Sequence, residues 1–289
     1  MAERSTISIG SRVARGAPLL PFATYVVLFL IVPTASVVVG AFEKSSGGFT
    51  LDNVRTATTG VYRHGLITSL ELAAVTSIVP AIGGTLLASA ILSSGRTGLR
   101  RAVLSVSGTF ANFGGVPLAF LFIATLGTTG VATKWLQAIG LDPYHHGFSL
   151  YTFSGVALVY MYFQVPLMVL VITPALDGMQ ATWREAADSL GATSWQYWRR
   201  VGIPILMPSF LGGLLLLFGS GLSAYATAAA LTSGSIPLTP IQIGAFLSGN
   251  VISGQENVGK ALGFLLIAIV APTMAVYAVL QRKASRWLQ

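Results

Sequence analysis

Apolar residues are gathered into six long runs along the chain, and polar residues into the segments between them. Each run holds about 20 or more mostly apolar residues, the length that an α-helix needs to cross the hydrocarbon core of a bilayer. Backbone that is exposed to lipid must satisfy its hydrogen bonds within its own segment, so each run is expected to be helical. The pattern predicts an all-α membrane protein with six transmembrane helices, at residues 21–42, 66–92, 102–126, 150–176, 210–231 and 260–280.

Apart from the segment 182–208, the segments between the runs are predicted to be loops, with one short helix at 131–139. The third run is interrupted by the Gly-Gly-Val-Pro sequence at 114–117. A break of this kind frees backbone groups that lipid cannot satisfy, so it is expected to face protein or a water-filled cavity. The first run follows a basic segment, as in a signal peptide. It exceeds the 7 to 15 apolar residues of such a signal, and we interpret it as a membrane helix.

Composition agrees with a membrane protein. Hydrophobic residues make up 53% of the 289 residues and charged residues only 9%, whereas a soluble domain has about a quarter charged residues. Cysteine is absent and histidine numbers three, so neither disulfides nor a metal site is expected. We interpret the pair His145-His146 as a solvated loop feature, and no cofactor is predicted.

The basic residues are distributed unevenly between the loops. The N-terminus, the 93–101 loop, the 182–208 segment and the C-terminus hold three Lys or Arg each, 12 of the 17 in the chain. The positive-inside rule places that side in the cytoplasm, with both termini. A net charge of +8 would suggest nucleic acid as the partner of a soluble protein, but this topology accounts for it, and no nucleic-acid partner is predicted.

The polar segment 182–208 between the fourth and fifth runs is the most informative stretch of the chain for its function. Thr182 and Glu185 have the spacing of a capping box, in which a hydroxyl and a carboxylate each satisfy a backbone N–H at the start of a helix. A short helix is therefore predicted to begin there and to end at Gly191, since glycine accepts the left-handed conformation of a helix C-terminus.

A second short helix is predicted to begin at Thr193 or Ser194 and to stop at Gly202 and Pro204. Two helices of this length are too short to be stable alone. A compact pair of them on a membrane surface fits docking into a groove of another protein. The alternative is an ordinary amphipathic connector that lies on the lipid surface.

The same segment contains Glu185-Ala186-Ala187, then Gly191 after three residues, the aromatic Trp198, Val201 and the pair Ile203-Pro204. These residues resemble the EAA loop of permease subunits of bacterial type I ABC importers. The pattern is E-A-A-x-x-x-G, then a bulky residue, an aliphatic residue, and an aliphatic residue followed by proline. The resemblance implies a coupling helix, which sits in a cleft of a cytoplasmic ATPase and passes nucleotide-driven motion to the membrane helices. The residues to which it assigns this coupling role are Glu185, Ala186, Ala187, Gly191, Trp198 and Pro204.

The wider resemblance runs from about residue 65 to the C-terminus and is strongest to the polyamine, iron, phosphonate and sulfate group. The segment 222–227 departs from the Gly-acidic-Phe sequence of several of these, which leaves the substrate open. The implied complex contains two permease subunits, identical or homologous, a cytoplasmic ATPase dimer and an extracytoplasmic substrate-binding protein in the bacterial inner membrane. Residues 1–289 would form one transmembrane permease domain, with its core at 65–281 and the coupling loop at 182–208.

One motif imitates a nucleotide site. Residues 254–261 fit G-x-x-x-x-G-K, but Ala261 stands where a phosphate-binding loop has the Ser or Thr that binds magnesium, and no strand is predicted before it. We reject the motif. The chain is expected not to be an enzyme, and ATP hydrolysis would belong to the partner ATPase.

Polar residues inside the runs are candidates for a solute pathway. Glu71 is the clearest ionisable one, and a carboxylate at membrane depth usually faces a cavity, a partner helix or an ion path. Its alternative is a position near the helix end that reaches water. For the others the alternative is helix packing, as in the small-residue ladder Ser220, Ala224 and Ala228. The pathway candidates are Glu71, Asn112, Gln164, Ser223, Tyr225 and Thr227.

The sequence thus predicts the transmembrane subunit of an ATP-driven ABC importer, which carries a small solute of the polyamine type or similar by alternating access. An ion-driven secondary transporter would need several intramembrane charges, and this chain offers Glu71 almost alone. A membrane scaffold without transport is the third hypothesis. Glu185→Lys and Gly191→Asp are the changes expected to uncouple an importer.

Overall fold

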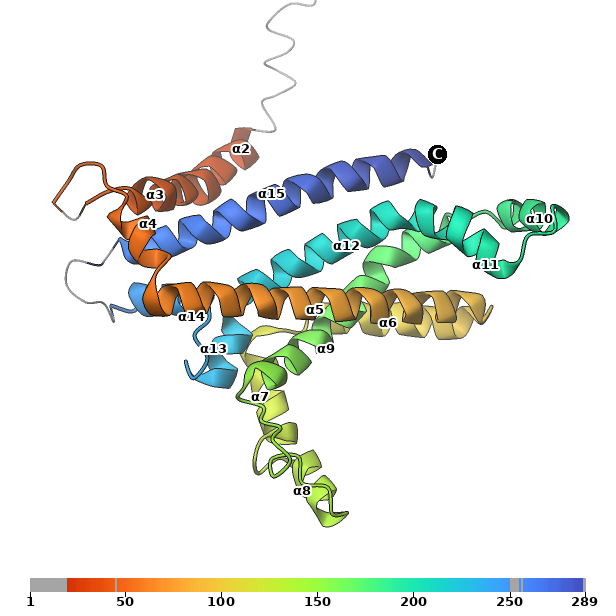
Figure 1. Cartoon of the computed structure of the whole chain (residues 1–289), viewed down its shortest axis with the longest axis horizontal. Coiled ribbons are helices and arrows are strands. Elements are labelled where there is room, and N and C mark those ends of the chain that lie inside the picture. Colours follow the sequence, from red (N-terminus) through yellow and green to blue (C-terminus); the bar gives the residue numbers. More distant parts are fainter. Residues whose placement is uncertain (1–19, 45, 250–254, 256, 288–289) are drawn as a thin grey trace, which may run out of the picture.

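The computed structural model describes residues 20–44, 46–249, 255 and 257–287, and in this part of the chain the only β-type pairing is one isolated bridge between Glu43 and Phe49. All other regular structure there is helical (Figure 1). The helices are α2 (Leu20–Val26), η2 (Val27–Ile31), α3 (Val32–Ala41), α4 (Asp52–Ala57), α5 (Gly60–Ser93), α6 (Thr97–Asn112), α7 (Gly115–Leu126), α8 (Val131–Ala138), α9 (Phe153–Asp177), α10 (Ala181–Ser189), α11 (Ser194–Tyr197), η3 (Trp198–Gly202), α12 (Ile203–Ser223), α13 (Ala226–Thr232), α14 (Thr239–Leu247) and α15 (Val258–Trp287).

Six helical segments of the described chain are long and apolar enough to cross a membrane, which confirms the predicted all-α membrane fold. Four of them overlap the predicted runs closely, the third and the fifth are shifted, and α8 confirms the short helix expected at 131–139. The six spans are Leu20–Ala41, Gly60–Ser93, Gly115–Ala138, Phe153–Asp177, Ser194–Ser223 and Val258–Arg282.

The centre of the bundle lies where α5, α9 and α12 pack against one another. Met168 of α9 is fully buried there between two glycines, Gly84 of α5 and Gly213 of α12. A Cβ added at Gly84 would lie 2.7 Å from the Met168 Cβ, and one added at Gly213 would lie 2.7 Å from its Sδ. The missing side chains therefore allow the three helices to approach closely, as small residues do in membrane bundles.

The third run differs from the prediction. It consists of two helices, α6 and α7, which meet at the break before Gly115 and point in different directions (Figure 1). The candidate span is Gly115–Ala138, which takes in α7 and α8. The loop predicted at 93–101 comprises only residues 94–96. Gly95 turns the chain there with a φ of 66°, and α6 begins directly afterwards, at Thr97.

Two further segments that were predicted to be loops contain helices. α4 lies within 43–63, and α14 lies within 232–258. Both pack against long helices, α4 on α15 and α14 on α5 and α15. Tertiary packing gives these short segments the stability that helices of their length lack alone.

The fifth run also departs from the prediction. Gly202 and Pro204 were expected to stop a helix, but the chain stays helical from Ser194 to Ser223. The turn widens at η3, where the Ile203 N–H donates to the Trp198 carbonyl. A π-type turn shifts the hydrogen-bond register and accommodates a proline, which has no N–H to donate.

The helix of the fifth run ends at Ser223, within the segment that was expected to be continuous to 231. Ala224 is extended, and α13 follows from Ala226. The Tyr160 hydroxyl donates to the Ala224 carbonyl and replaces the helical bond lost at the break. The expected ladder of Ser220, Ala224 and Ala228 is therefore not one continuous helix face.

Several connections gather at the two ends of the long helices, while α7 and α8 project away from the middle of the molecule (Figure 1). The α5–α6 turn, α10 and the end of α15 lie toward one end, and α4 and α14 lie toward the other. Three of the four basic segments, namely 93–101, 182–208 and the C-terminus, thus gather at the same end. The fourth, with Arg4, Arg12 and Arg15, lies outside the described residues.

Candidate functional site

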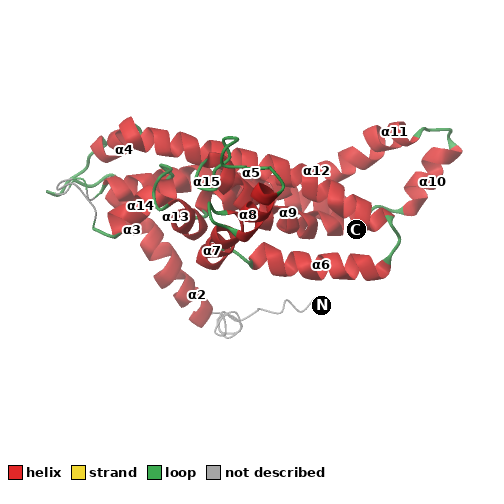
Figure 2. Cartoon of the chain, turned by 90° about the horizontal axis from the view of Figure 1, so that it is seen from below, coloured by secondary structure: helices red, strands yellow, loops and turns green. Residues whose placement is uncertain are grey.

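α10 protrudes from the end of the bundle beyond the long helices (Figure 2). None of its residues is buried. The coupling candidates that it carries, Glu185, Ala186 and Ala187, are therefore exposed or half-buried. Such a helix has no packing of its own to stabilise it, so its position depends on the turns at its two ends.

The turn after α10 is a Schellman motif. Gly191 has a φ of 73°, its N–H donates to the Asp188 carbonyl at 3.0 Å, and the Ala192 N–H donates to the Ala187 carbonyl at 3.0 Å. Glycine takes this left-handed position without the steric cost of a Cβ. The predicted end of the helix at Gly191 is confirmed.

The predicted capping box at Thr182 and Glu185 is wrong. α10 starts one residue earlier, at Ala181, with Gln180 as its N-cap and no side-chain cap. Thr182 is already helical there, and its hydroxyl donates to the Gln180 Oε1 at 3.4 Å. A capping box does form in the next helix, where the Thr193 hydroxyl accepts from the Gln196 N–H and the Gln196 Oε1 accepts from the Thr193 N–H.

Arg184 ties α10 to the helix that follows. Its Nη2 donates to the Ser194 Oγ at 2.8 Å, its Nε lies 3.3 Å from the Asp188 Oδ1, and its guanidinium lies 5.1 Å from the centre of the Tyr197 ring. A planar guanidinium can make these contacts at once, whereas a lysine ammonium cannot. Sequence reasoning missed this residue because its partners lie on both sides of the turn.

We expect Arg184→Lys to lower solute uptake severalfold, because α10 would lose its fixed angle to α11 while the membrane core stays intact. Uptake per inserted chain measures the effect. Arg200→Lys is the matched control, since Arg200 is exposed in η3. Equal uptake by the two variants would show that the Arg184 contacts do not position α10.

The tip of the loop carries two large apolar side chains in solvent. Leu190 is 87% exposed and Trp195 is 68% exposed. Leu190 was not among the predicted coupling residues, although it directly precedes Gly191. Tryptophan is enriched among the residues that anchor protein interfaces, and an exposed leucine nearby can add apolar contact area.

The remaining two coupling candidates link this tip to the membrane helices. Trp198 is half-buried and packs against the core at the end of α9, and Pro204 is exposed in the first turn of α12. α11, η3 and α12 are continuous, so only the turn at 190–193 lies between α10 and the fifth span.

Two pathway candidates line one cavity at the other end of α12. Ser223 and Tyr225, at the break before α13, border a cavity of about 370 Å³ together with Pro240, Ile243, Gly244, Leu247, Ser248 and Leu266. Gly244 makes room for the Tyr225 ring, since a Cβ there would lie 2.7 Å from it. Tyr225 is 46% exposed, and the structure gives its hydroxyl no partner among the described residues.

Two other candidates make local or packing contacts. Asn112 is exposed at the end of α6 and donates to the Gly108 carbonyl of its own helix at 2.8 Å. The buried Thr227 hydroxyl accepts from the Gly115 N–H at 2.8 Å and donates to the Gly115 carbonyl at 3.2 Å. Thr227 thereby fastens α13 to the start of α7.

Gln164 is fully buried between helices and lines none of the cavities described here. Its Nε2 donates to the Thr76 Oγ1 at 3.4 Å, and its Oε1 has no partner among the described residues. A Cβ at Gly221 would lie 3.0 Å from both side chains. The residue therefore sits at the crossing of α5, α9 and α12.

Glu71 is exposed on α5, about three turns of helix after its start at Gly60. The same face of α5 carries exposed Val75, Ile78 and Ile82. The carboxylate thus lies on a mostly apolar surface and outside the cavity at Tyr225. The structure does not bring it together with Ser223 and Tyr225.

Two sequence features were not assigned a function, namely the phosphate-loop imitation at 254–261 and the pair His145-His146. Residues 254 and 256 of the phosphate-loop imitation lie outside the described residues, and its second half begins α15.

His145 and His146 are exposed beside Asp142, which accepts from the Tyr144 and His145 N–H groups. A side-chain hydrogen bond with Gln137 is the main cause that lowers the pKa of Asp142. Among the described residues no group of three His, Asp or Glu is placed to hold a metal.

These features define a class of protein: a helical, multi-pass membrane protein whose fifth span is continuous with a protruding polar loop. Residues 146–287 match the family model described as "Binding-protein-dependent transport system inner membrane component". The matched region contains the protruding loop and the last three spans.

Relatives extend the similarity over most of the chain. A probable sulfate transport system permease protein of Nephroselmis olivacea is 26% identical over 274 residues, 92% of this chain and 90% of the relative. The sulfate transport system permease protein CysW of Synechococcus elongatus is 24% identical over 262 residues, 91% of this chain and 87% of the relative.

A solved structure has the same fold. A chain of a bacterial alginate ABC transporter, in complex with an alginate pentasaccharide-bound periplasmic protein, superposes with a TM-score of 0.74. The match covers 99% of both chains at 20% identity. The family model thus places residues 146–287 among binding-protein-dependent transport inner-membrane components, and over most of its length the chain is similar to permease subunits of type I ABC importers. It is a multi-pass protein of the plasma membrane.

Proposed function

We propose that this chain forms part of the solute pathway of an ATP-driven importer and couples it through α10 to a cytoplasmic ATPase dimer. A second permease subunit, identical or homologous, would complete the pathway, and an extracytoplasmic binding protein would deliver the solute. Residues 1–289 would act as one transmembrane domain with its core at 65–281. The α10 end would face the cytoplasm, in keeping with its basic residues.

The protruding turn is the observation that carries this proposal. Leu190 and Trp195 hold apolar surface in water at the tip of α10, and the Schellman turn and Arg184 fix their position. A binding groove that buried these side chains would gain about 2 kcal/mol or more from each. Closure of the ATPase dimer could then move α12 and change the relative stability of inward-facing and outward-facing states.

We further propose a sulfate-type oxyanion as the solute. The two relatives that match nine-tenths of the chain are named as sulfate permeases. Among the described residues no charged side chain lines the cavity at the α12–α13 break, whereas Ser223, Tyr225 and Ser248 do. The Ser223 and Ser248 hydroxyls already donate to the carbonyls of Gly219 and Gly244. The Tyr225 hydroxyl is therefore the one that can donate to an oxyanion, while a cationic polyamine would be favoured by carboxylates. The polyamine-type solute suggested by the sequence is therefore the less favoured one.

Tyr225→Phe is expected to raise the KM of solute uptake about fivefold, since one hydrogen bond to the solute contributes about 1 kcal/mol. The ring would still pack against Gly244, so the fold should be unchanged. Tyr25→Phe, on the exposed face of α2, is the control. An unchanged KM in Tyr225→Phe would remove this hydroxyl from the pathway.

The docking proposal is tested with a photoreactive amino acid at position 190, in cells that express the full chain. The expected adduct is a nucleotide-binding ATPase subunit. Position 247 is the control, because Leu247 is 85% exposed and lies on α14 at the other end of the molecule (Figure 1). It should give no ATPase adduct. Adducts of an ATPase at 247 but not at 190 would reverse the proposed orientation, and none at either position would contradict the proposal.

A further inference from the structure

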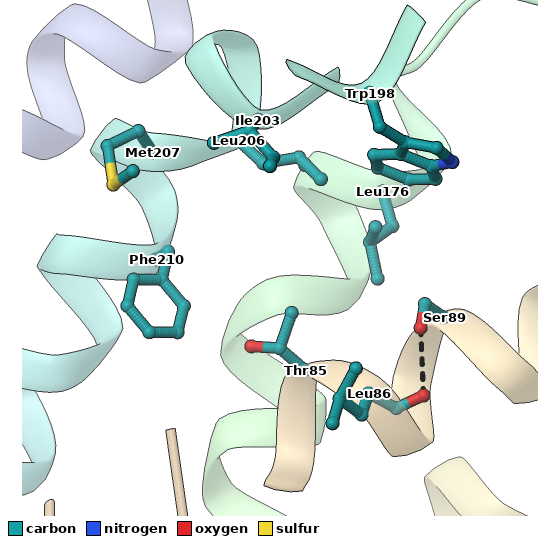
Figure 3. A pocket seen from close by; sticks show the side chains of 9 residues that line it. All are labelled: Thr85, Leu86, Ser89, Leu176, Trp198, Ile203, Leu206, Met207 and Phe210. Carbon is teal, nitrogen blue, oxygen red and sulfur yellow. Dashed lines mark hydrogen bonds between the residues drawn. The ribbon is translucent and has the colours of Figure 1, made fainter. Parts of the chain in front are cut away.

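Two cavities lie next to each other at the α10 end of the bundle, away from the cavity at Tyr225. The first, of about 420 Å³, is apolar and lies between α5, the end of α9 and the start of α12. Figure 3 shows Leu86, Leu176, Trp198 and Phe210 around the open space. Leu86, Ile203 and Met207 are exposed, so this space is a groove at the surface of the bundle.

The second cavity, of about 260 Å³, is basic. It lies where α5 ends and α6 begins, and it is lined by Arg96, Arg100 and Asp177 among others. Asp177 forms an ion pair with Arg100. The Arg96 guanidinium has no hydrogen-bond or ion-pair partner in the described part of the chain, so one positive charge in this cavity is unbalanced.

The order of the two cavities along α5 is informative. Thr85, Leu86 and Ser89 border the apolar groove, while Leu92 and Gly95 border the basic cavity, and Leu176 lines both. Thr85 and Leu92 are two helical turns apart, roughly 10 Å. A charged pocket therefore sits at the end of a membrane helix, and an apolar groove continues from it toward the bilayer centre.

We propose that these two cavities together bind one anionic phospholipid, with its phosphate at Arg96 and an acyl chain in the groove against Leu86 and Phe210. A basic pocket at the membrane surface attracts anionic head groups, and the groove offers the chain an apolar surface. A sulfate-type solute would use the basic cavity alone and leave the groove empty. Because Trp198 lines the groove, the lipid would contact the segment that joins α10 to α12.

Because the basic cavity also contains a carboxylate, the proposal predicts opposite effects on lipid binding for changes at Asp177 and at Arg96. Asp177 holds Arg100, and a surface ion pair of this kind adds little to stability. Asp177→Asn should release Arg100 and strengthen binding of an anionic lipid, while Arg96→Gln should weaken it. A purely structural role of these residues would not produce opposite effects on lipid binding.

The test uses the full-length chain in nanodiscs with phosphatidylglycerol that carries a photoreactive acyl chain. Phosphatidylcholine with the same chain is the comparison. We expect phosphatidylglycerol to label peptides that contain 85–89 or 203–210 about fivefold more strongly, from about 1 kcal/mol per arginine at the membrane surface. Arg96→Gln should remove this preference and Asp177→Asn should increase it.

Two further variants complete the experiment. Arg101→Gln is the charge-matched control, since Arg101 is exposed and does not line the cavity. It should keep the preference. Leu86→Trp should fill the groove and reduce labelling by both lipids. Equal labelling by the two lipids in the unmodified chain, a preference that survives Arg96→Gln, or no label in either peptide would overturn the proposal. None of these readouts depends on transport or on the ATPase.

Discussion

Replacing Gly191 with valine is expected to lower solute uptake by tenfold or more while the chain stays inserted and folded. The glycine has a φ of 73°, and nothing lies within 4 Å of a Cβ added to it. A β-branched residue is strongly disfavoured in this conformation, so the Schellman turn would open. Leu190 and Trp195 would then lose their fixed position, and a loss of about 1.4 kcal/mol in docking is a factor of ten.

Gly140→Val is the matched control for this change. Gly140 follows α8 in a Schellman turn of the same kind, with a φ of 84° and no neighbour within 4 Å of its Cβ. The backbone strain of the two variants should therefore be alike, about 1–2 kcal/mol. Uptake and ATP hydrolysis are measured per folded complex. Equal losses in both variants would mean that strain, and not docking of α10, causes the defect.

The milder changes suggested by the sequence remain predictions. Aspartate tolerates the left-handed conformation better than valine does, so Gly191→Asp would act mainly through its new charge at the tip. Glu185→Lys would reverse an exposed charge on α10, where the structure shows no ion-pair partner for Glu185 among the described residues. Both changes should uncouple ATP hydrolysis from uptake less completely than Gly191→Val.

Gly84→Leu is expected to have the largest effect on stability. A Cβ at this position would lie 2.7 Å from the Met168 Cβ and 2.9 Å from the Val165 carbonyl oxygen. Because one of these neighbours is backbone, α5 and α9 would have to separate at the centre of the bundle. Overpacking of a membrane core in this way should cost about 3 kcal/mol.

Gly83→Leu is the control for the core prediction, since a Cβ at the adjacent glycine meets nothing within 4 Å. Leucine should even favour the helix there. The thermal unfolding temperature of the purified chain in detergent separates the two variants. An unfolding temperature for Gly84→Leu that matched the one for Gly83→Leu would show that the α5–α9 contact is looser than the structure describes.

The sequence predicted the membrane spans well because lipid imposes a minimum apolar length on every crossing helix. The sequence-based prediction was wrong where tertiary packing determines where a helix begins or ends. α6 carries Arg100 and Arg101 in its first turns and was divided between a loop and a span, and Pro204 was expected to end a helix that η3 carries past it. α4 and α14 have no strong sequence signal, because long neighbouring helices stabilise them.

The candidate site was predicted in part. Gly191 could be placed from its spacing, since a helix end requires a left-handed residue. Arg184 could not, because its contacts to Ser194 and Tyr197 depend on the angle between two helices. Ser223 and Tyr225 were chosen as polar residues at membrane depth, and the break after α12 brings them to one cavity. Thr227 and Gln164 satisfied the same criterion but make packing contacts.

The most direct test of the proposed function is accumulation of radiolabelled sulfate in proteoliposomes that contain the complex purified through this chain, together with its binding protein. We predict uptake that requires ATP on the α10 side and that Gly191→Val lowers by tenfold or more while Gly140→Val does not. Sulfate uptake that proceeds without ATP, or that is equal in the two variants, would contradict the coupling of this permease through α10.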